Sequence, residues 1–157
     1  MVIVDAQSVK NTETAQTKGY DGGKKVSGIK RHIAVDTEGL PHALTVTAAN
    51  VTDRAGAVAM IEKSKKTLDS VKNILVDGGY TGPVFQEQIM SLIAATVEVA
   101  KRSELHTFAV IPKRWVVERS FSWIEKCRRL WKNCERLLES SRAMVQLAFI
   151  RILVKRF

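Results

Sequence analysis

Three acidic residues occupy positions from which their carboxylates could work together. Asp5 follows the short apolar run of residues 2–4, and Asp77 follows the apolar run of residues 73–76. Glu118 lies in a segment with helical spacing. A single aspartate at the end of a strand more often caps a turn than performs chemistry. Three carboxylates brought together would repel one another unless a divalent cation such as Mg²⁺, which prefers oxygen ligands, bound between them.

Such a cluster has a specific chemical use. Two Mg²⁺ ions about 4 Å apart can activate an attacking hydroxyl and stabilise the leaving oxygen of a phosphodiester. The alternative for Glu118 is a helix ion pair with Arg114, four residues earlier, which contributes about 0.3 kcal/mol. The two roles are compatible, because a carboxylate has two oxygens.

The basic residues are concentrated toward the C-terminus. The 157-residue chain has a net charge of +9, and residues 101–157 hold 14 Lys and Arg against 5 acidic residues, which is the whole excess. This imbalance predicts binding to a polyanion, most often nucleic acid, that weakens with salt; a solvated helix face is the alternative. The residues that could contact DNA phosphates are Lys24, Lys25, Lys30, Arg31, Arg119, Lys126, Arg128 and Arg129.

Composition excludes several classes of protein. With 45% hydrophobic and 26% charged residues, the chain is typical of one globular domain. No apolar run approaches the roughly 20 residues of a membrane span, and no secretory signal is evident. Cys127 and Cys134 are expected to be reduced thiols in the cytoplasm. Neither they nor His32 has zinc-ligand spacing, and His32 is expected to be a hydrogen-bonded strand residue.

Short apolar runs alternate with helical patterns, which predicts an α/β fold with a mixed five-stranded sheet flanked by helices. A polar, glycine-rich segment, residues 10–28, is expected to be a loop or loose hairpin arm. Trp115, Trp123 and Trp131 are expected to be packing residues. Strands are predicted at 2–4, 29–36, 40–49, 73–76 and 95–99, and helices at 54–67, 83–93, 112–132 and 140–155.

Four segments together resemble the catalytic domain of DDE-type insertion-sequence transposases. They are VDAQSVKNT with Asp5, KRHIAVDTEGLP, ILVDGGYTG with Asp77, and PKRWVVERSFSWIEKCRRL with Glu118. The resemblance covers nearly the whole chain. It implies an RNase H-like fold and makes Asp5, Asp77 and Glu118 the catalytic, metal-binding triad for two Mg²⁺ ions, which Mn²⁺ can replace. Arg114 matches the family's basic residue four before the glutamate, and the resemblance adds Arg114 to the expected DNA-contacting residues. The basic residue seven after the glutamate is not matched, because Glu125 stands there.

The resemblance also implies an activity and partners. The expected reaction is cleavage and strand transfer of double-stranded DNA at transposon ends and target sites. Because only four residues precede Asp5, residues 1–157 are expected to form one catalytic domain without an N-terminal DNA-end-binding region. We expect a homo-oligomer on DNA, a possible N-terminal partner polypeptide, and a bacterial cytoplasmic location at the nucleoid. The alternative function is that of a catalytically silent, DNA-binding or inhibitory remnant, and the intact triad favours the enzyme.

Overall fold

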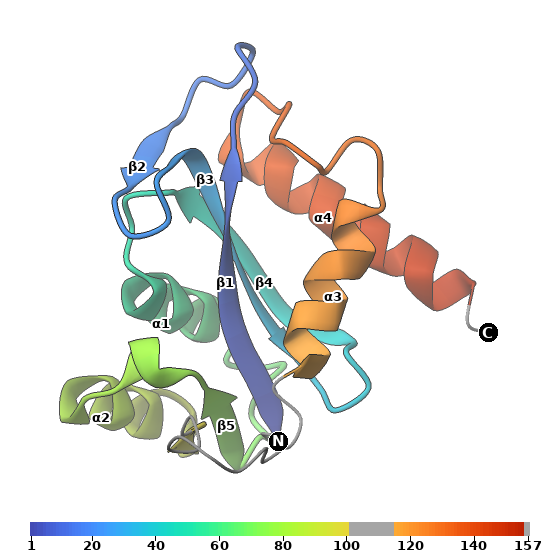
Figure 1. Ribbon diagram of the computed structural model, residues 1–157. Helices are drawn as coiled ribbons and strands as arrows, with labels where there is room; N and C mark the ends of the chain where they lie inside the picture. The colour runs from blue at the N-terminus through green and yellow to red at the C-terminus, as the bar shows by residue number, and fades with distance from the viewer. Residues whose placement is uncertain (101–114, 156–157) are drawn as a thin grey trace, which may run out of the picture.

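The computed structural model describes residues 1–100 and 115–155, and a mixed sheet lies at the centre of the described part (Figure 1). Five of its strands follow the order β2-β3-β1-β5-β6. The sixth strand, β4, lies outside this order and pairs with β3. The strands are β1 (Val2–Lys10), β2 (Gly19–Asp21), β3 (Val26–Val35), β4 (Pro41–Ala48), β5 (Asn73–Val76) and β6 (Thr96–Val99). The pairs of β3 with β1, β2 and β4 are antiparallel, whereas β1, β5 and β6 run parallel. The predicted mixed α/β sheet is therefore confirmed, with the short β2 added by the glycine-rich arm.

Helices cover both faces of the sheet (Figure 1). Their bounds are α1 (Asp53–Lys63), η1 (Gly78–Tyr80, a 3₁₀ turn), α2 (Pro83–Ile93), α3 (Trp115–Glu125) and α4 (Leu138–Val154). One hydrophobic core lies between the sheet and α1 and α2, and a second lies between the sheet and α3 and α4. None of the described helices is both long and apolar enough to cross a lipid bilayer.

The first strand is longer than the sequence suggested. The apolar run was expected to end at Asp5, but β1 continues to Lys10 and pairs with β3 from Ile3↔Val35 to Lys10↔Gly28. Polar residues are tolerated here because antiparallel pairing with a ten-residue partner satisfies the backbone along the whole strand. Asp5 consequently lies within a strand, where it is paired with Ile33 of β3.

Three predicted helices have different ends. The helix expected to reach residue 67 stops at Lys63, and α4 begins at Leu138 rather than Ser140. The long helix predicted over 112–132 ends at Glu125, because the backbone of Cys127 and Leu130 turns back in tight hydrogen bonds to Ile124 and Cys127. Its start lies outside the described residues. Thr52 caps the start of α1, since its hydroxyl accepts a hydrogen bond from the Ala55 N–H at 3.2 Å.

The α1 helix lies directly against β3 at one glycine. A side-chain carbon added to Gly56 would overlap the imidazole of His32, which is fully buried and hydrogen-bonds through Nε2 to Thr47 Oγ1 at 2.9 Å. Burial lowers the pKa of His32 to about 4, so the ring is neutral at pH 7. His32 is thus a packed, hydrogen-bonded strand residue, as expected.

This contact predicts a sensitive position for stability. Gly56→Ala should lower the free energy of unfolding by about 2–3 kcal/mol, because neither a buried ring nor the helix backbone can yield cheaply. Urea unfolding followed by circular dichroism measures the change. Gly22→Ala is the matched control, since an added carbon there meets nothing within 4 Å. Equal stability of the two variants would contradict the close packing of α1 on His32.

Candidate active site

Two of the three predicted carboxylates come from adjacent parallel strands. The register of β1 against β5 pairs Val2 with Ile74 and Ile3 with Leu75. Asp5 follows two residues after Ile3 in β1, and Asp77 directly follows the end of β5. Alternate residues of a strand face the same side, so Asp5 shares the side of Ile3, which is the face that α3 covers.

Short hydrogen bonds orient both carboxylates. The backbone N–H of Ala6 donates to Asp5 Oδ1 at 2.7 Å, and that of Gly79 donates to Asp77 Oδ1 at 2.9 Å. Asp77 has an extended backbone and is the N-terminal cap of η1. Such a cap both satisfies an N–H at the start of the turn and fixes the direction of the carboxylate.

The third predicted carboxylate, Glu118, belongs to α3, which packs on the face of the sheet that contains Ile3 and Leu75. Gln7 Nε2 donates to Glu125 Oε1 at 2.6 Å, which sets the height of α3 against β1. Glu118 lies seven residues earlier on the same helix face, about 10 Å along the axis, and three residues of a strand span about the same length. Because α3 and β1 run in the same direction (Figure 1), Glu118 comes level with Val4 and Asp5.

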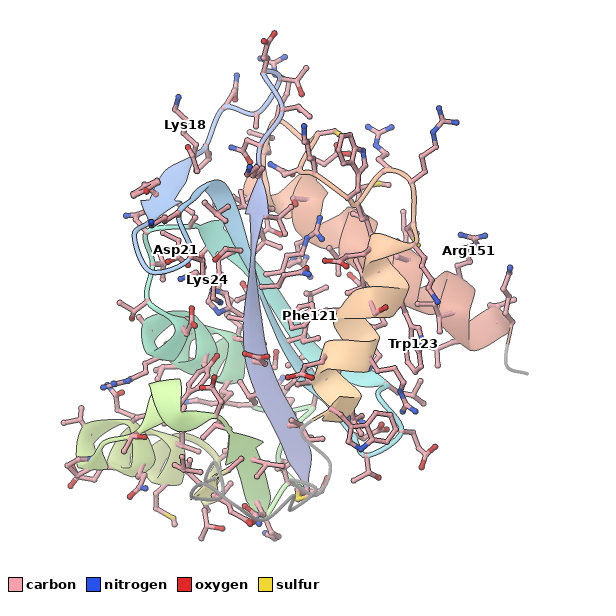
Figure 2. All side chains as sticks on the ribbon, viewed as in Figure 1. Lys18, Asp21, Lys24, Phe121, Trp123 and Arg151 are labelled. Carbon is pink, nitrogen blue, oxygen red and sulfur yellow. The ribbon has the colours of Figure 1, made fainter. Side chains whose placement is uncertain are left out.

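Packing explains why α3 lies at this height. Phe121 is buried between α3 and β1, whereas Trp123 lies on the other side of the helix (Figure 2). Val117 and Ile124 are buried in the same core as Ile3. Apolar residues at 117, 121 and 124 form the stripe typical of an amphipathic helix, and Glu118 lies exposed at its edge.

The carboxylates of Asp5, Asp77 and Glu118 are suited to a hard cation, although the three do not form a metal-binding cluster in this structure. Carboxylate oxygens are the ligands that Mg²⁺ prefers. Within residues 1–100 and 115–155, however, no three His, Cys, Asp or Glu side chains lie close enough to hold a metal ion together. Burial, and then the nearby charges of Asp5, Asp53 and Asp77, raise the pKa of the buried Tyr80. The three aspartates thus lie close enough to Tyr80 for their charges to act on the same buried hydroxyl.

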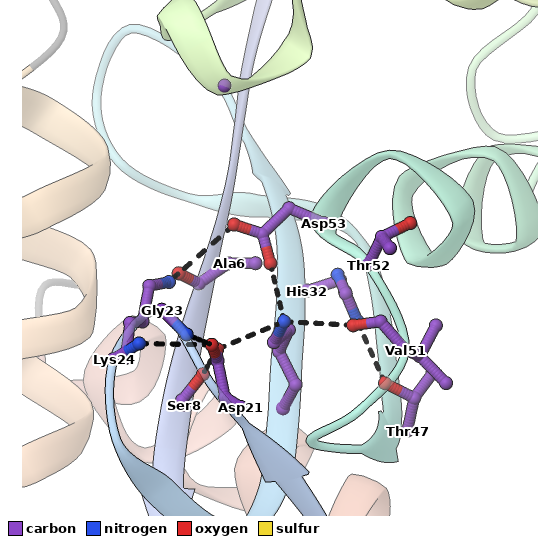
Figure 3. Close-up of polar contacts among 12 residues, drawn as sticks. Ala6, Ser8, Asp21, Gly23, Lys24, His32, Thr47, Val51, Thr52 and Asp53 are labelled. Carbon is purple, nitrogen blue, oxygen red and sulfur yellow. Dashed lines mark hydrogen bonds and ion pairs between the residues drawn. The ribbon is translucent and has the colours of Figure 1, made fainter.

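Two of the predicted DNA-contacting residues are buried instead. Lys30 is 4% exposed, and its ammonium lies 3.1 Å from Asp21 Oδ2 and 2.8 Å from Asp53 Oδ1 (Figure 3). Arg31 is 0% exposed on the opposite face of the sheet, where Nη2 donates to the carbonyl of Leu130 at 2.9 Å. Adjacent strand residues face opposite sides, so one lysine and one arginine enter different cores.

Lys24 and Lys25 are exposed in the turn before β3. The Lys24 ammonium donates to the carbonyl of Ala6 at 2.9 Å and lies 3.6 Å from Asp53 Oδ2. Through these contacts Lys24 joins the β2–β3 turn to β1 and to the start of α1.

The remaining predicted basic residues lie on α3 and just after it. Arg119 is stacked between Trp115 and Trp123, with ring centroids 4.5 and 4.9 Å from its guanidinium carbon. Beyond the helix, Lys126, Arg128 and Arg129 are exposed. Arg114 lies outside the described residues.

The expectation that all three tryptophans pack internally is wrong for two of them. Trp115 and Trp131 are 51% and 61% exposed. Trp115 does not lie on the side of α3 that is buried. Trp131 follows the end of the helix, so the eight-residue spacing does not place the tryptophans on one helix face. Their rings are instead covered in part by the cationic side chains of Arg119 and Lys132.

Sequence reasoning missed the residues that join α1 to the Asp77 turn. Arg54 Nε donates to the carbonyl of Gly79 at 2.9 Å. Arg54, Gly79 and Lys24 line a groove of about 790 Å³ between the β2–β3 turn and the start of α1. The only local signal was the cap at Thr52-Asp53, which marks the beginning of a helix but not its neighbours in space.

The chain is similar to a family model, to a known protein and to a solved structure. Residues 1–153 match the family model described as a transposase DDE domain. The protein named as the transposase for insertion sequence element IS402 of Burkholderia cepacia is 30% identical over 132 residues, or 80% of this chain. The chain spans 60% of the length of that relative.

A solved structure shares the fold. A chain in the cryo-EM structure of the simian T-cell lymphotropic virus intasome in complex with PP2A regulatory subunit B56 gamma superimposes with a TM-score of 0.59 and 16% identity. The match covers 94% of the chain described above and 46% of the intasome chain. Together with the sheet order, this similarity confirms the predicted RNase H-like fold.

Proposed function

Because this chain belongs to the DDE transposase family, we propose that it is a catalytic domain that cuts DNA at insertion-sequence ends and joins the freed 3′-hydroxyl to target DNA. Asp5, Asp77 and Glu118 are the proposed catalytic residues. The observation that supports the proposal is the parallel pairing of β1 with β5, because Asp5 lies in β1 and Asp77 directly follows β5. A rigid pair of carboxylates with a third on an adjoining helix is suited to phosphodiester chemistry.

Each residue of the triad has a distinct part in the proposal. Asp5 and Asp77 would hold two Mg²⁺ ions, which Mn²⁺ can replace, and Glu118 would complete the site from α3. Bound there, the ions would supply activation of the attacking hydroxyl and stabilisation of the leaving oxygen. Asp5 lies within β1 and Asp77 is the N-terminal cap of η1, whereas Glu118 is exposed on its helix.

The proposed substrate is double-stranded DNA, from both transposon ends and target. Lys24, Lys25, Lys126, Arg128 and Arg129 are exposed, and phosphate contacts from such side chains position DNA without reading its sequence. The proposed contacts are Lys24, Lys25, Arg114, Arg119, Lys126, Arg128 and Arg129. Lys30 and Arg31 are left out, because both are buried.

We also propose that the domain acts as a homo-oligomer on DNA, with DNA-end recognition supplied by an N-terminal region or partner polypeptide. Leu147, Ile150 and Val154 are exposed along one side of α4. Apolar residues at this spacing form a stripe that is suited to pairing with another helix. A bacterial cytoplasmic location at the nucleoid belongs to the same proposal.

The test is nicking of supercoiled plasmid by the purified chain in Mg²⁺ or Mn²⁺, with EDTA as the blank. Nicking that depends on the metal ion supports the enzyme. Salt-sensitive retardation of the plasmid without nicking under any metal condition would favour the DNA-binding remnant instead. If the plasmid is neither retarded nor nicked, both proposed functions are contradicted.

A further inference from the structure

The turn that carries Asp77 is held from outside by a residue of α1. Gly79 has two backbone polar groups, and each is bound. Its N–H donates to Asp77 Oδ1 at 2.9 Å, and its carbonyl accepts from Arg54 Nε at 2.9 Å. Arg54 is therefore linked to the Asp77 carboxylate through a single residue.

We propose that Arg54 is a positioning residue for Asp77, acting through Gly79; this rests on the proposed metal-binding function of Asp77. The turn contains two adjacent glycines, Gly78 and Gly79, which are both exposed and intrinsically permissive in backbone conformation. Their geometry is consequently set by hydrogen bonds rather than by packing. Partners that orient a metal ligand typically affect metal affinity strongly.

Gly79 lies close to the carboxylate. A side-chain carbon added to Gly79 would lie only 3.0 Å from Asp77 Oδ1. A shift of the Gly79 backbone would move the hydrogen-bond donor on which Asp77 Oδ1 depends. Losing the bond from Arg54 would permit that shift.

Arg54 is well placed for this role because its own backbone is fixed. It is the second residue of α1, whose first turn is capped by Thr52. The neighbouring Asp53 is tied to the buried Lys30. Behind them, Ala57, Met60 and Ile61 are fully buried against the sheet. The Arg54 side chain extends from this anchored turn to the end of β5.

Arg54 is exposed and lines the groove beside the site, so a charge contact with DNA is the competing explanation. Two uncharged variants separate the alternatives. In Arg54→Gln, the amide Nε2 is as many bonds from Cα as the arginine Nε, so the donor to Gly79 is kept. In Arg54→Met, a methyl group takes that place. Both variants lose the charge, and only the second loses the donor.

The measurement is Mn²⁺ affinity without DNA, from electron paramagnetic resonance of the free ion, followed by plasmid nicking as a function of Mg²⁺. Arg54→Met should raise the Mn²⁺ dissociation constant and the Mg²⁺ requirement about tenfold. Arg54→Gln should stay within about twofold of the wild type on the same reasoning. The thermal midpoint without metal should be the same in all three proteins.

Several results would overturn the proposal, and they are distinguishable from failure of the proposed function. Unchanged Mn²⁺ affinity in both variants, with equally weakened DNA binding, would assign Arg54 to phosphate contact. Equal loss of Mn²⁺ affinity in both would mean that charge, not the hydrogen bond to Gly79, matters. Absence of Mn²⁺ binding by the wild type itself would overturn the metal-binding function and the role of Arg54 with it.

Discussion

Asp77→Asn should lower metal-dependent nicking of plasmid DNA about a thousandfold, because a lost metal ligand removes several kcal/mol of transition-state stabilisation. Asparagine keeps an oxygen where Asp77 Oδ1 now accepts the Gly79 N–H. The cap of η1 and the extended backbone at residue 77 are thereby preserved. What is removed is the negative charge that a divalent cation requires. The initial rate of conversion from supercoiled to nicked plasmid in Mg²⁺ is the quantity to measure.

The matched control is Asp69→Asn, an exposed aspartate outside the site, which should nick at the wild-type rate. Near-ultraviolet circular dichroism should be the same for all three proteins, because no packed side chain changes volume. Retention of more than about a tenth of the wild-type rate by Asp77→Asn would contradict a catalytic role for Asp77, since a tenfold effect corresponds to little over 1 kcal/mol.

Lys30→Met should destabilise the fold by about 3–5 kcal/mol, the usual effect of removing one partner from a buried ion pair. Lys30 lies between Asp21 and Asp53 and also donates to the carbonyl of Val51 at 2.8 Å. Methionine fills a similar volume but leaves two carboxylates without their main counter-charge. Urea unfolding at pH 7 measures the loss, and Lys66→Met, at an exposed lysine, is the control.

Lys30, Asp21 and Asp53 belong to separate elements, so Lys30→Met should weaken the contact between those elements as well as the ion pairs themselves. The ion pairs join the β2–β3 turn, through Asp21, to the start of α1, through Asp53, and the Ser8 hydroxyl of β1 donates to Asp21 Oδ2 at 2.6 Å. Adding Asp21→Asn and Asp53→Asn to Lys30→Met should recover a large part of the lost stability, because no unpaired charge then remains. A triple variant no more stable than Lys30→Met would contradict this account.

The same network has a defined pH dependence. Hydrogen bonds from Ser8 and from the Lys24 backbone N–H, together with Lys30, hold the pKa of Asp21 well below its usual range. A carboxyl whose pKa is lowered by folding stabilises the protein above its unfolded pKa of about 3.9 and ceases to do so as pH falls through the folded value. Wild-type stability should therefore fall below about pH 4. The fall should be shallower in Lys30→Met, where Asp21 has lost its buried cation.

Much of the chemistry is determined locally in the sequence. Apolar runs that end in Asp5 and Asp77, and an acidic residue on the edge of an amphipathic helix, specify the three carboxylates and the cation they suit. The strand predicted over residues 73–76 has the bounds of β5. Hydrophobic periodicity and turn residues act over a few positions, which is why such elements can be recognised from the sequence alone.

Only the tertiary structure decided which basic residues are available to DNA. Lys30 and Arg31 are adjacent in the sequence, yet one is paired with Asp21 and Asp53 and the other lies in the opposite core beneath Leu130. Whether a strand lysine is buried depends on whether distant carboxylates reach it, because burial of an unpaired charge is too costly. Arg54 is a second case, since its bond to Gly79 exists only once α1 lies beside the end of β5. The sequence alone indicated which carboxylates and basic residues to propose for the site, and the packing of separate elements determined their neighbours.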